Sequence, residues 1–264
     1  MVSAASPDAP PPAPLLAPDE PAPFEVLEDS AQSPFLITCD HASNRLPRAL
    51  GDLGVPQPEL ERHIAWDLGA AGVARALARK LGAFAALQNY SRLVIDCNRR
   101  PGVPSSIVEI SEQTPIPGNR ALSPSEAARR ARDIFTPYHQ RILEELARRA
   151  RALQPTVLIA VHSFTPTFHG VSRPWHVGVL YNRDTRLAHA VLELLRCDPE
   201  LVVGDNEPYA VSDLSDYGVV EYGERLGNPH VELEVRQDLL LEERGQTEWA
   251  ERFAELLPRA CARF

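Results

Sequence analysis

The chain has 264 residues, of which 44% are hydrophobic and 24% charged, and its formal net charge is −9. This composition is typical of a globular protein with enough apolar material for a sizeable core. The acidic balance argues against a nucleic-acid-binding surface, because phosphate affinity depends on clustered Lys and Arg. The arginine-rich stretches EAARRARD and EELARRARAL are interleaved with Glu and predict solvated helix faces.

Signals for export or membrane insertion do not stand out. No apolar run approaches the roughly 18 residues needed to cross a bilayer, so no membrane association is expected. The N-terminus has neither the basic start nor the apolar core of a signal peptide. The four cysteines lie far apart without a CxxC pair, which favours reduced thiols. We therefore expect a cytoplasmic protein.

The first segment, residues 1–23, holds 8 of the chain's 25 prolines. Proline fixes φ and lacks an N–H group, so this Pro/Ala-rich arm is expected to stay extended and to contribute little to the core, although it could pack on the surface. Residues 24–264 are then expected to form a single α/β domain.

Beyond the arm, short apolar strands alternate with longer helices. Near-continuous hydrophobicity predicts strands buried on both faces, over residues 34–41, 83–90, 92–98, 156–164, 176–182 and 230–237. Helices are expected over residues 58–81, 123–152, 184–196 and 244–258. In the second of these, Ser123 should be the N-cap and Pro137 should bend or split the helix. The alternation predicts a three-layer α/β fold whose central sheet is mixed and mostly parallel, with helices on both faces.

Four of the predicted strands carry or run into side chains that can bind ligands or transfer protons. The carboxyl ends of the strands are where α/β sheets usually bind ligands. These groups are Asp40 and His41, then Asp96, Asn98, Arg99 and Arg100, then His162 and Ser163, and last Glu232, Glu234 and Arg236. Their recurrence at strand ends predicts one shared site.

His41 and His162 each follow an apolar stretch, where a neutral imidazole could ligate a metal such as zinc. Alone, each could equally be a hydrogen-bonded structural histidine, but the pair favours a metal site. Catalytic zinc usually has three protein ligands and an open position for water, so a carboxylate is expected as the third. We favour Asp67, placed on a helix among apolar neighbours, because a buried acid needs a partner. It could instead pair with a histidine four residues earlier, and Asp40 and Asn44 are alternative ligands.

Glu234 is the candidate general base, although Glu232, Glu234 and Arg236 share one strand face and could form a structural Glu–Arg pair. Arg99 could clamp a substrate carboxylate with its guanidinium fork, or be an ordinary surface arginine. Other chemistries fit less well, because the sequence has neither a GxSxG elbow nor a Gly-rich phosphate loop. The GDNEPY segment, residues 204–209, is either an ordinary loop or a pocket wall.

The ordered motifs CDHASNRLP, HIAWDLGA, YSRLVIDCNR, IPGN, PYH, VHSFTP, RPWHVGVLY, VGDNEPY and VELEVRQDLL resemble the N-formylglutamate amidohydrolase family, in particular its branch of predicted amidohydrolases. The similarity runs from about residue 34 to 250. More distantly, the chain resembles the zinc carboxypeptidase and aspartoacylase group, which implies a phosphorylase/hydrolase-like α/β fold.

The more distant resemblance also implies roles for individual residues. His41 matches the first histidine of the HxxE motif, VHSF gives His162 as a ligand, IDCNR gives Arg99 as the carboxylate binder, and VELEVRQD gives Glu234 as the catalytic acid/base. The chain departs from this group at Asn44, where HxxE has its glutamate. Asp67 matches an aspartate of the amidohydrolase motifs and is the expected replacement.

The resemblance implies metal-assisted hydrolysis of N-formyl-L-glutamate to formate and L-glutamate, a step of amino-acid catabolism associated with histidine degradation. The cofactor would be a divalent metal, Zn²⁺, which lowers the pKa of bound water from about 15.7 to around 7. Its ligands would be His41, Asp67 and His162. Glu234 would transfer the proton, Arg99 would hold a carboxylate, and Asn98 and Asn206 would add polar contacts.

Two alternatives remain open at this stage. The enzyme could act on another N-acyl amino acid, or the chain could be a non-catalytic binding relative that lost its metal with the HxxE glutamate. In each case the expected partner is a small molecule, and the oligomeric state is left open.

Overall fold

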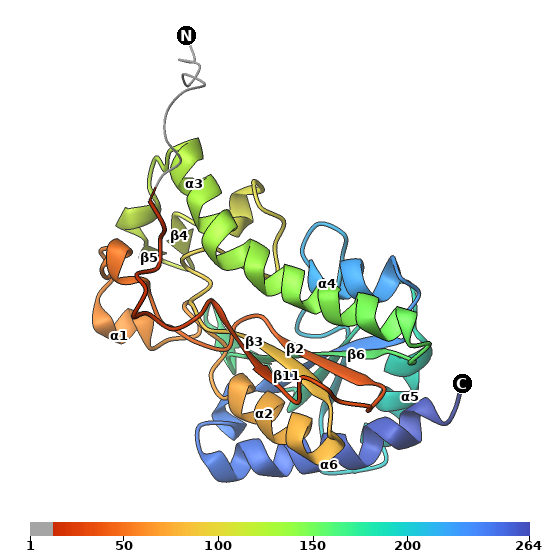
Figure 1. Cartoon of the computed structure of the whole chain (residues 1–264). Coiled ribbons are helices and arrows are strands. Elements are labelled where there is room, and N and C mark those ends of the chain that lie inside the picture. Colours follow the sequence, from red (N-terminus) through yellow and green to blue (C-terminus); the bar gives the residue numbers. More distant parts are fainter. Residues whose placement is uncertain (1–12) are drawn as a thin grey trace.

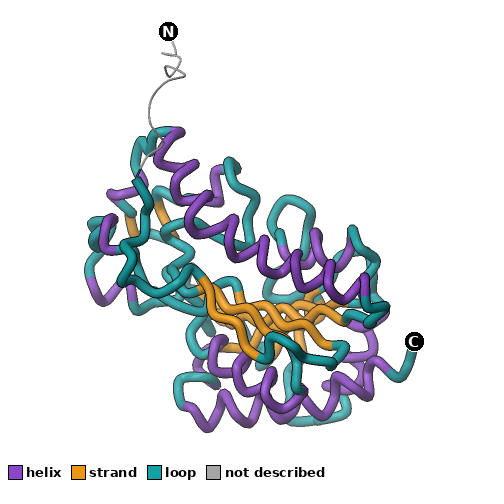
Figure 2. The backbone as a smooth tube through the Cα atoms, viewed as in Figure 1, coloured by secondary structure: helices purple, strands orange, loops and turns teal. Residues whose placement is uncertain are grey.

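The computed structural model describes residues 13–264 and is built around a seven-stranded sheet (Figures 1 and 2). The strand order is β1-β3-β2-β6-β11-β9-β10. Strands β3, β2, β6 and β11 run parallel to one another, as do β9 and β10, whereas β1 is antiparallel to β3 and β9 to β11. The strands span Phe24–Leu27 (β1), Phe35–Cys39 (β2), Phe84–Gln88 (β3), Val157–Phe164 (β6), Val177–Leu180 (β9), Val203–Asp205 (β10) and His230–Arg236 (β11). The predicted mixed, mostly parallel sheet is confirmed.

Helices cover both faces of the sheet, as predicted, with α2, α5 and α6 on one face and α4 on the other (Figure 1). The helices span Gln57–Leu60 (α1), Ala70–Leu81 (α2), Pro124–Arg130 (α3), Thr136–Arg151 (α4), Arg186–Leu195 (α5) and Glu243–Cys261 (α6). Two small hairpins lie outside the sheet, formed by Ile110–Ser111 (β4) with Thr114–Pro115 (β5) and by Thr167–Phe168 (β7) with Val171–Ser172 (β8). Among the described residues, none of the helices has the length and apolar character that crossing a membrane requires.

The central strands are buried on both faces, which explains why their sequences are almost continuously hydrophobic. Successive side chains point to opposite faces, so Ile37 packs in the core under α2 and α6 while Leu36 packs under α4. The carboxyl ends of β2, β6 and β11 lie side by side in this arrangement. They bring residues from three distant parts of the chain to one place.

The strand predicted over 92–98 is wrong. This segment forms turns, and its apolar side chains are buried between the strands and the flanking loops and helices. The physical reason is that β1 already pairs with β3 at that edge of the sheet, so the segment has no strand to join. A short apolar run does not distinguish a strand from another buried segment.

The single helix predicted over 58–81 is also wrong. It is divided into α1 and α2 by a loop, and Asp67 lies in that loop rather than on a helix. Gly69 ends the loop with a φ of 77°, and a Cβ there would stand 2.3 Å from the Cβ of Leu240. Only glycine satisfies both conditions, so α2 begins after it.

The helix predicted over 123–152 is interrupted as expected. Ser123 Oγ accepts the backbone N–H of Glu126 at 3.2 Å, which confirms the N-cap. A π-helical turn at Ala131–Phe135 then separates α3 from α4, directly before Pro137, which has no N–H group to continue the pattern.

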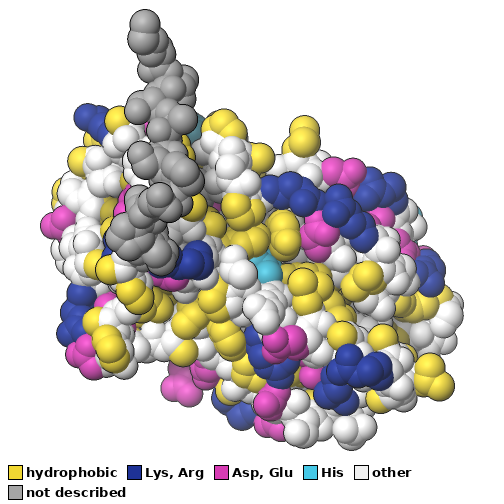
Figure 3. Space-filling view, turned by 45° about the horizontal axis from the view of Figure 1, so that its top comes forward, with side chains coloured by type: hydrophobic (Ala, Val, Ile, Leu, Met, Phe, Trp, Pro, Cys, Tyr) yellow, Lys and Arg dark blue, Asp and Glu magenta, His cyan; other side chains and the backbone are white. Residues whose placement is uncertain are grey.

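The arginine-rich stretches, predicted to form solvated helix faces, have two arginines that are buried instead. Basic and acidic side chains are interspersed on the face in Figure 3, but Arg130 and Arg149 are fully buried. Arg149 pairs with Glu145 at 2.8 Å and donates to backbone carbonyls before and in β2. Arg130 donates to the carbonyl of Val94 at 3.0 Å and so fixes the 92–98 segment.

The described part of the arm, residues 13–23, packs against the domain, while the first twelve residues lie outside the described part of the chain. Leu15 is buried in the core next to α4, and its N–H donates to Asp133 at 2.6 Å. The hydroxyl of Tyr90 donates to the carbonyl of Pro21 at 2.8 Å.

His139 of α4 is buried against the 92–98 segment. Its Nε2–H donates to the carbonyl of Cys97 at 2.9 Å, and its Nδ1 accepts the hydroxyl of Tyr222. Both ring nitrogens are thus used by the neutral imidazole. Burial lowers the pKa of His139 to about 4, with Asp40 opposing this in part.

A His139→Gln variant should therefore have a weaker dependence of stability on pH. In the wild type, the unfolded state takes up a proton near pH 6.5 while the folded state resists it until about pH 4, so stability falls as the pH drops through this window. Between pH 7.5 and pH 5 this amounts to about 2 kcal/mol. Urea unfolding of both proteins at the two pH values measures it, and equal losses in the two proteins would contradict the assignment.

Candidate metal centre and active site

A cavity of about 430 Å³ opens at the carboxyl ends of β2, β6 and β11. Such ends are where α/β sheets usually bind ligands. Six of the residues predicted for the site line it, namely His41, Asp67, Asn98, Arg99, His162 and Glu234. Asn206 is not among the lining residues.

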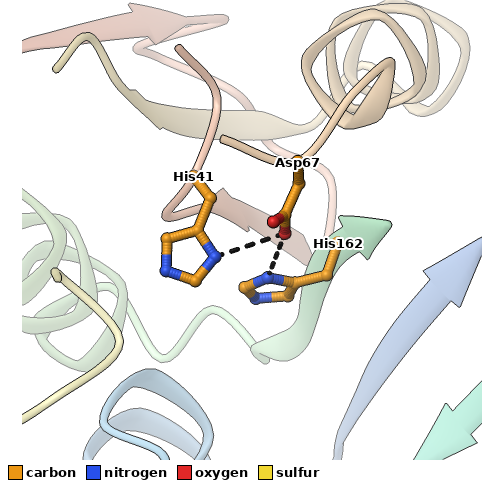
Figure 4. A group of neighbouring side chains, drawn as sticks. All are labelled: His41, Asp67 and His162. Atoms are coloured by element: carbon orange, nitrogen blue, oxygen red, sulfur yellow. Dashed lines mark hydrogen bonds and ion pairs between the residues drawn. The ribbon is translucent and has the colours of Figure 1, made fainter. Parts of the chain in front are cut away.

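Asp67 lies between the two histidines (Figure 4). Its Oδ2 is 3.2 Å from Nδ1 of His41 and 2.9 Å from Nδ1 of His162. All three side chains are buried, and one ligand atom from each lies within 4.8 Å of the others. Burial alone would raise the pKa of Asp67, but the histidines more than offset it and hold that pKa far below its usual range. Asp67 is therefore ionised.

The loop that carries Asp67 is attached to both neighbouring strands. The N–H of Asp67 donates to the carbonyl of His41 at 2.9 Å, just beyond β2. The hydroxyl of Ser163 in β6 donates to the carbonyl of Leu68 at 2.8 Å. Together with the packing of Gly69 on Leu240, these bonds fix the position of the loop that carries Asp67.

Asp96 orients the first histidine. Its Oδ1 lies 2.7 Å from Nε2 of His41, and its other oxygen lies 2.5 Å from the guanidinium of Arg92. An ionised Asp96 only accepts, so Nε2–H of His41 donates to it, and this bond fixes the ring so that Nδ1 faces Asp67 and would be the nitrogen offered to a bound metal. Arg92 also lies 3.6 Å from Asp67. The sequence places Asp96 among the polar groups at strand ends but does not indicate a role for it, and it does not single out Arg92 at all.

The three side chains fit a divalent metal. Two imidazole nitrogens and a carboxylate oxygen converge, and an acid positions one imidazole from behind, as is usual at zinc sites. The other candidate ligands point elsewhere. Asp40 accepts the hydroxyl of Tyr138 at 2.6 Å and keeps its other oxygen 3.8 Å from Nε2 of His162, and Asn44 donates to the carbonyl of Leu60 at 3.0 Å. The change from HxxE glutamate to Asn44 therefore leaves a complete three-residue donor set.

Glu234 lies beside His162, because β11 and β6 pair in parallel with these residues in register. It is buried, and its Oε2 has no hydrogen-bond partner. Burial is the main cause that raises the pKa of Glu234 to about 7, while the nearby His162 opposes the rise. The alternative structural pair between Glu234 and Arg236 does not form, because the guanidinium of Arg236 donates to Asp238 at 2.8 Å instead.

Glu232, one step back on the same face of β11, also lines the cavity. Its Oε2 is likewise without a partner, and burial raises the pKa of this carboxyl well above its usual value. The sequence noted its place on this face without assigning it a role.

Arg99 and Asn98 line the cavity but are partly committed to the fold. One guanidinium nitrogen of Arg99 donates to the carbonyls of Asn98, at 2.8 Å, and of Ser215. The side chain of Asn98 donates to Asp216 at 3.2 Å and accepts the N–H of Tyr217 at 2.8 Å. These contacts join the 92–98 segment to the 212–218 loop across one end of the cavity.

An Asp96→Ala variant should bind zinc about 10- to 100-fold more weakly than the wild type, because His41 loses the acid that fixes its tautomer and ring orientation. Competition with a chromophoric chelator measures the affinity. Asp198→Ala, which removes a partly exposed carboxylate paired with Arg252 away from the cavity, is the matched control and should leave zinc affinity unchanged. Equal affinities in the wild type and the Asp96 variant would contradict this role.

Comparison with known proteins shows the family to which this chain belongs. A family model described as N-formylglutamate amidohydrolase matches residues 33–241. A gene product of Agrobacterium tumefaciens with a solved structure is 35% identical, with a TM-score of 0.91, and the match covers 94% of this chain and 98% of that one. No curated protein matches the chain.

The N-formylglutamate amidohydrolase from Ralstonia eutropha JMP134 is 20% identical, with a TM-score of 0.69 over 90% of this chain and 99% of that one, which shows a shared fold. The family model spans most of the chain and all of the residues that form the candidate site. The chain thus belongs to the N-formylglutamate amidohydrolase family, and it is an amidohydrolase.

Proposed function

We propose that this amidohydrolase cleaves N-formyl-L-glutamate into formate and L-glutamate with a divalent metal, Zn²⁺, as its cofactor. The observation that carries the proposal is the buried convergence of His41, Asp67 and His162 next to an unpartnered Glu234 in one cavity. Family membership supports the choice of an N-formyl amino acid.

A zinc ion held by His41, Asp67 and His162 would supply a Lewis acid that polarises the amide carbonyl and lowers the pKa of water. The side chains of the chain do the rest. Asp96 keeps His41 oriented, and Arg92 balances the negative charge of Asp96 and Asp67. Arg92 stays protonated, because Asp96 and Asp67 raise its pKa despite burial.

Glu234 moves the proton. As the water oxygen attacks the formyl carbon, Glu234 accepts a proton from it, and it then delivers this proton to the amide nitrogen as the C–N bond breaks. A carboxyl with a pKa of about 7 can do both near neutral pH. Its position in register with His162 keeps it beside the ligand set throughout.

Arg99 would hold one substrate carboxylate through the part of its fork that is not bonded to the backbone. We infer that Asn98 acts by positioning the 212–218 loop. Asn206 would likewise act indirectly, because its Oδ1 accepts the N–H of Tyr181 at 3.0 Å.

A Glu234→Gln variant tests the proposal. Gln has nearly the same shape but neither accepts nor releases the proton, so kcat for formate release from N-formyl-L-glutamate should fall about 100-fold or more, with a smaller change in KM. Zinc content should stay at the wild-type level.

Glu248→Gln on the exposed side of α6 is the control and should keep full activity. Near-normal turnover by the Glu234 variant would rule out this residue as the proton carrier. A wild-type protein that releases acetate or succinate from other N-acyl amino acids, but no formate, would overturn the proposed substrate.

A further inference from the structure

Arg92 and Arg99 line the cavity, whereas Arg173 lies just behind its wall, and they differ in how their positive charge is balanced. Arg92 lies 2.5 Å from Asp96, and Arg99 lies 3.9 Å from Asp216, so a carboxylate already balances part of each charge. Arg173 forms no such ion pair with any described residue. Its guanidinium makes one hydrogen bond within this part of the chain, to the hydroxyl of Tyr209 at 2.8 Å.

Arg173 is enclosed by aromatic rings. Its guanidinium carbon lies 4.5 Å from the ring centre of Phe168, 4.7 Å from that of Tyr209 and 6.0 Å from that of Phe164. These three rings line the cavity, and Arg173 itself is only 8% exposed. Ring faces attract the cation but do not neutralise it. A desolvated positive charge without a counter-ion therefore lies against the cavity wall.

Tyr209 is the polar group that connects this charge to the cavity. Arg173 donates to the Tyr209 oxygen, so the phenolic proton is free for another acceptor. Tyr209 lines the same cavity as Glu234 and Asp67. After burial, Glu234 is the strongest cause that raises the pKa of Tyr209, and Asp67 contributes to the rise.

The loop that carries Tyr209 is held in place by close packing. A Cβ on Gly178 or Gly204 would stand 2.1 Å or 2.5 Å from the carbonyl oxygen of Glu207, so these two glycines let the loop lie directly on β9 and β10. The bond from Tyr181 to Asn206 fixes the same turn. The GDNEPY segment is therefore packed closely on the sheet, and its last residue, Tyr209, lines the cavity.

We propose that Tyr209, supported by Arg173, forms a second carboxylate subsite of the cavity, distinct from that of Arg99. The inference rests on the proposed function, because N-formyl-L-glutamate has two carboxylates and one arginine would hold only one of them. Tyr209 donates its hydroxyl proton to the carboxylate, and Arg173 positions that hydroxyl and supplies the positive charge.

The test compares kcat/KM for N-formyl-L-glutamate with the values for N-formyl-L-glutamine and N-formyl-L-isoglutamine, in which one carboxylate or the other is an amide. The wild type should prefer the diacid to both amides. Arg173→Met and Tyr209→Phe should each remove the preference over one amide, with a loss of about 10- to 100-fold on the diacid, mostly in KM. Arg99→Met should remove the preference over the other amide.

Arg252→Met is the matched control, because this arginine also stands over an aromatic ring, that of Trp249 at 5.6 Å, but away from the cavity. It should leave all three kcat/KM values unchanged. Tyr209→Phe keeps the ring that packs on Arg173, so it separates recognition from structural support. Equal losses on all three substrates in both the Arg173 and Tyr209 variants, or loss of the same preference in the Arg99 and Arg173 variants, would overturn the subsite.

Binding of glutarate, a diacid without an amide, separates this inference from the proposed reaction. Calorimetry on the zinc-loaded protein should show about 10-fold or greater weakening in both Arg173→Met and Tyr209→Phe. If the wild type released no formate but glutarate binding still depended on Arg173 and Tyr209, the reaction would fail and the subsite would stand. Unchanged glutarate binding in both variants would refute the subsite even if formate were released.

Discussion

The site depends on one buried carboxylate shared by two imidazoles. Asp67 faces Nδ1 of His41 and Nδ1 of His162 at once, and it remains ionised because of them. An unpaired buried carboxylate would be costly, so the contact constrains all three elements that supply it. The loop before α2 must reach the sheet at one point, and Gly69 is the residue that allows it.

The remaining chemistry follows from the sheet around this contact. Parallel pairing of β6 and β11 puts Glu234 in register with His162, so the proposed proton carrier stands beside the proposed ligands without a dedicated loop. The 92–98 segment supplies Asp96 behind His41, and it is fixed by the buried Arg130 and by His139. Two buried helix side chains that do not line the cavity thus hold an acid that orients a proposed ligand.

Much of this architecture could be predicted from the sequence, and the failures have physical causes. Five of the six predicted strands are present, because continuous apolar runs reflect burial on both faces. The run at 92–98 has the same composition, but β1 occupies the sheet edge that it would need. The sequence indicates Asp67 as a candidate ligand, and the residue does line the cavity, but the prediction that it lies on a helix is wrong. The helix begins only after Gly69, which packs on Leu240, a residue distant in sequence. Arg173 and Tyr209 belong to separate segments, and only the fold joins them.

The central claim is that Asp67 completes a metal site on which hydrolysis depends. Formate release from N-formyl-L-glutamate tests it most directly, measured on chelator-stripped protein before and after one equivalent of Zn²⁺, with zinc content determined in parallel, for the wild type and Asp67→Ala. The account predicts that stripping abolishes release, that zinc restores it in the wild type, and that the variant neither retains zinc nor recovers. Full activity in the stripped wild type, or a variant that recovers as the wild type does, would contradict it.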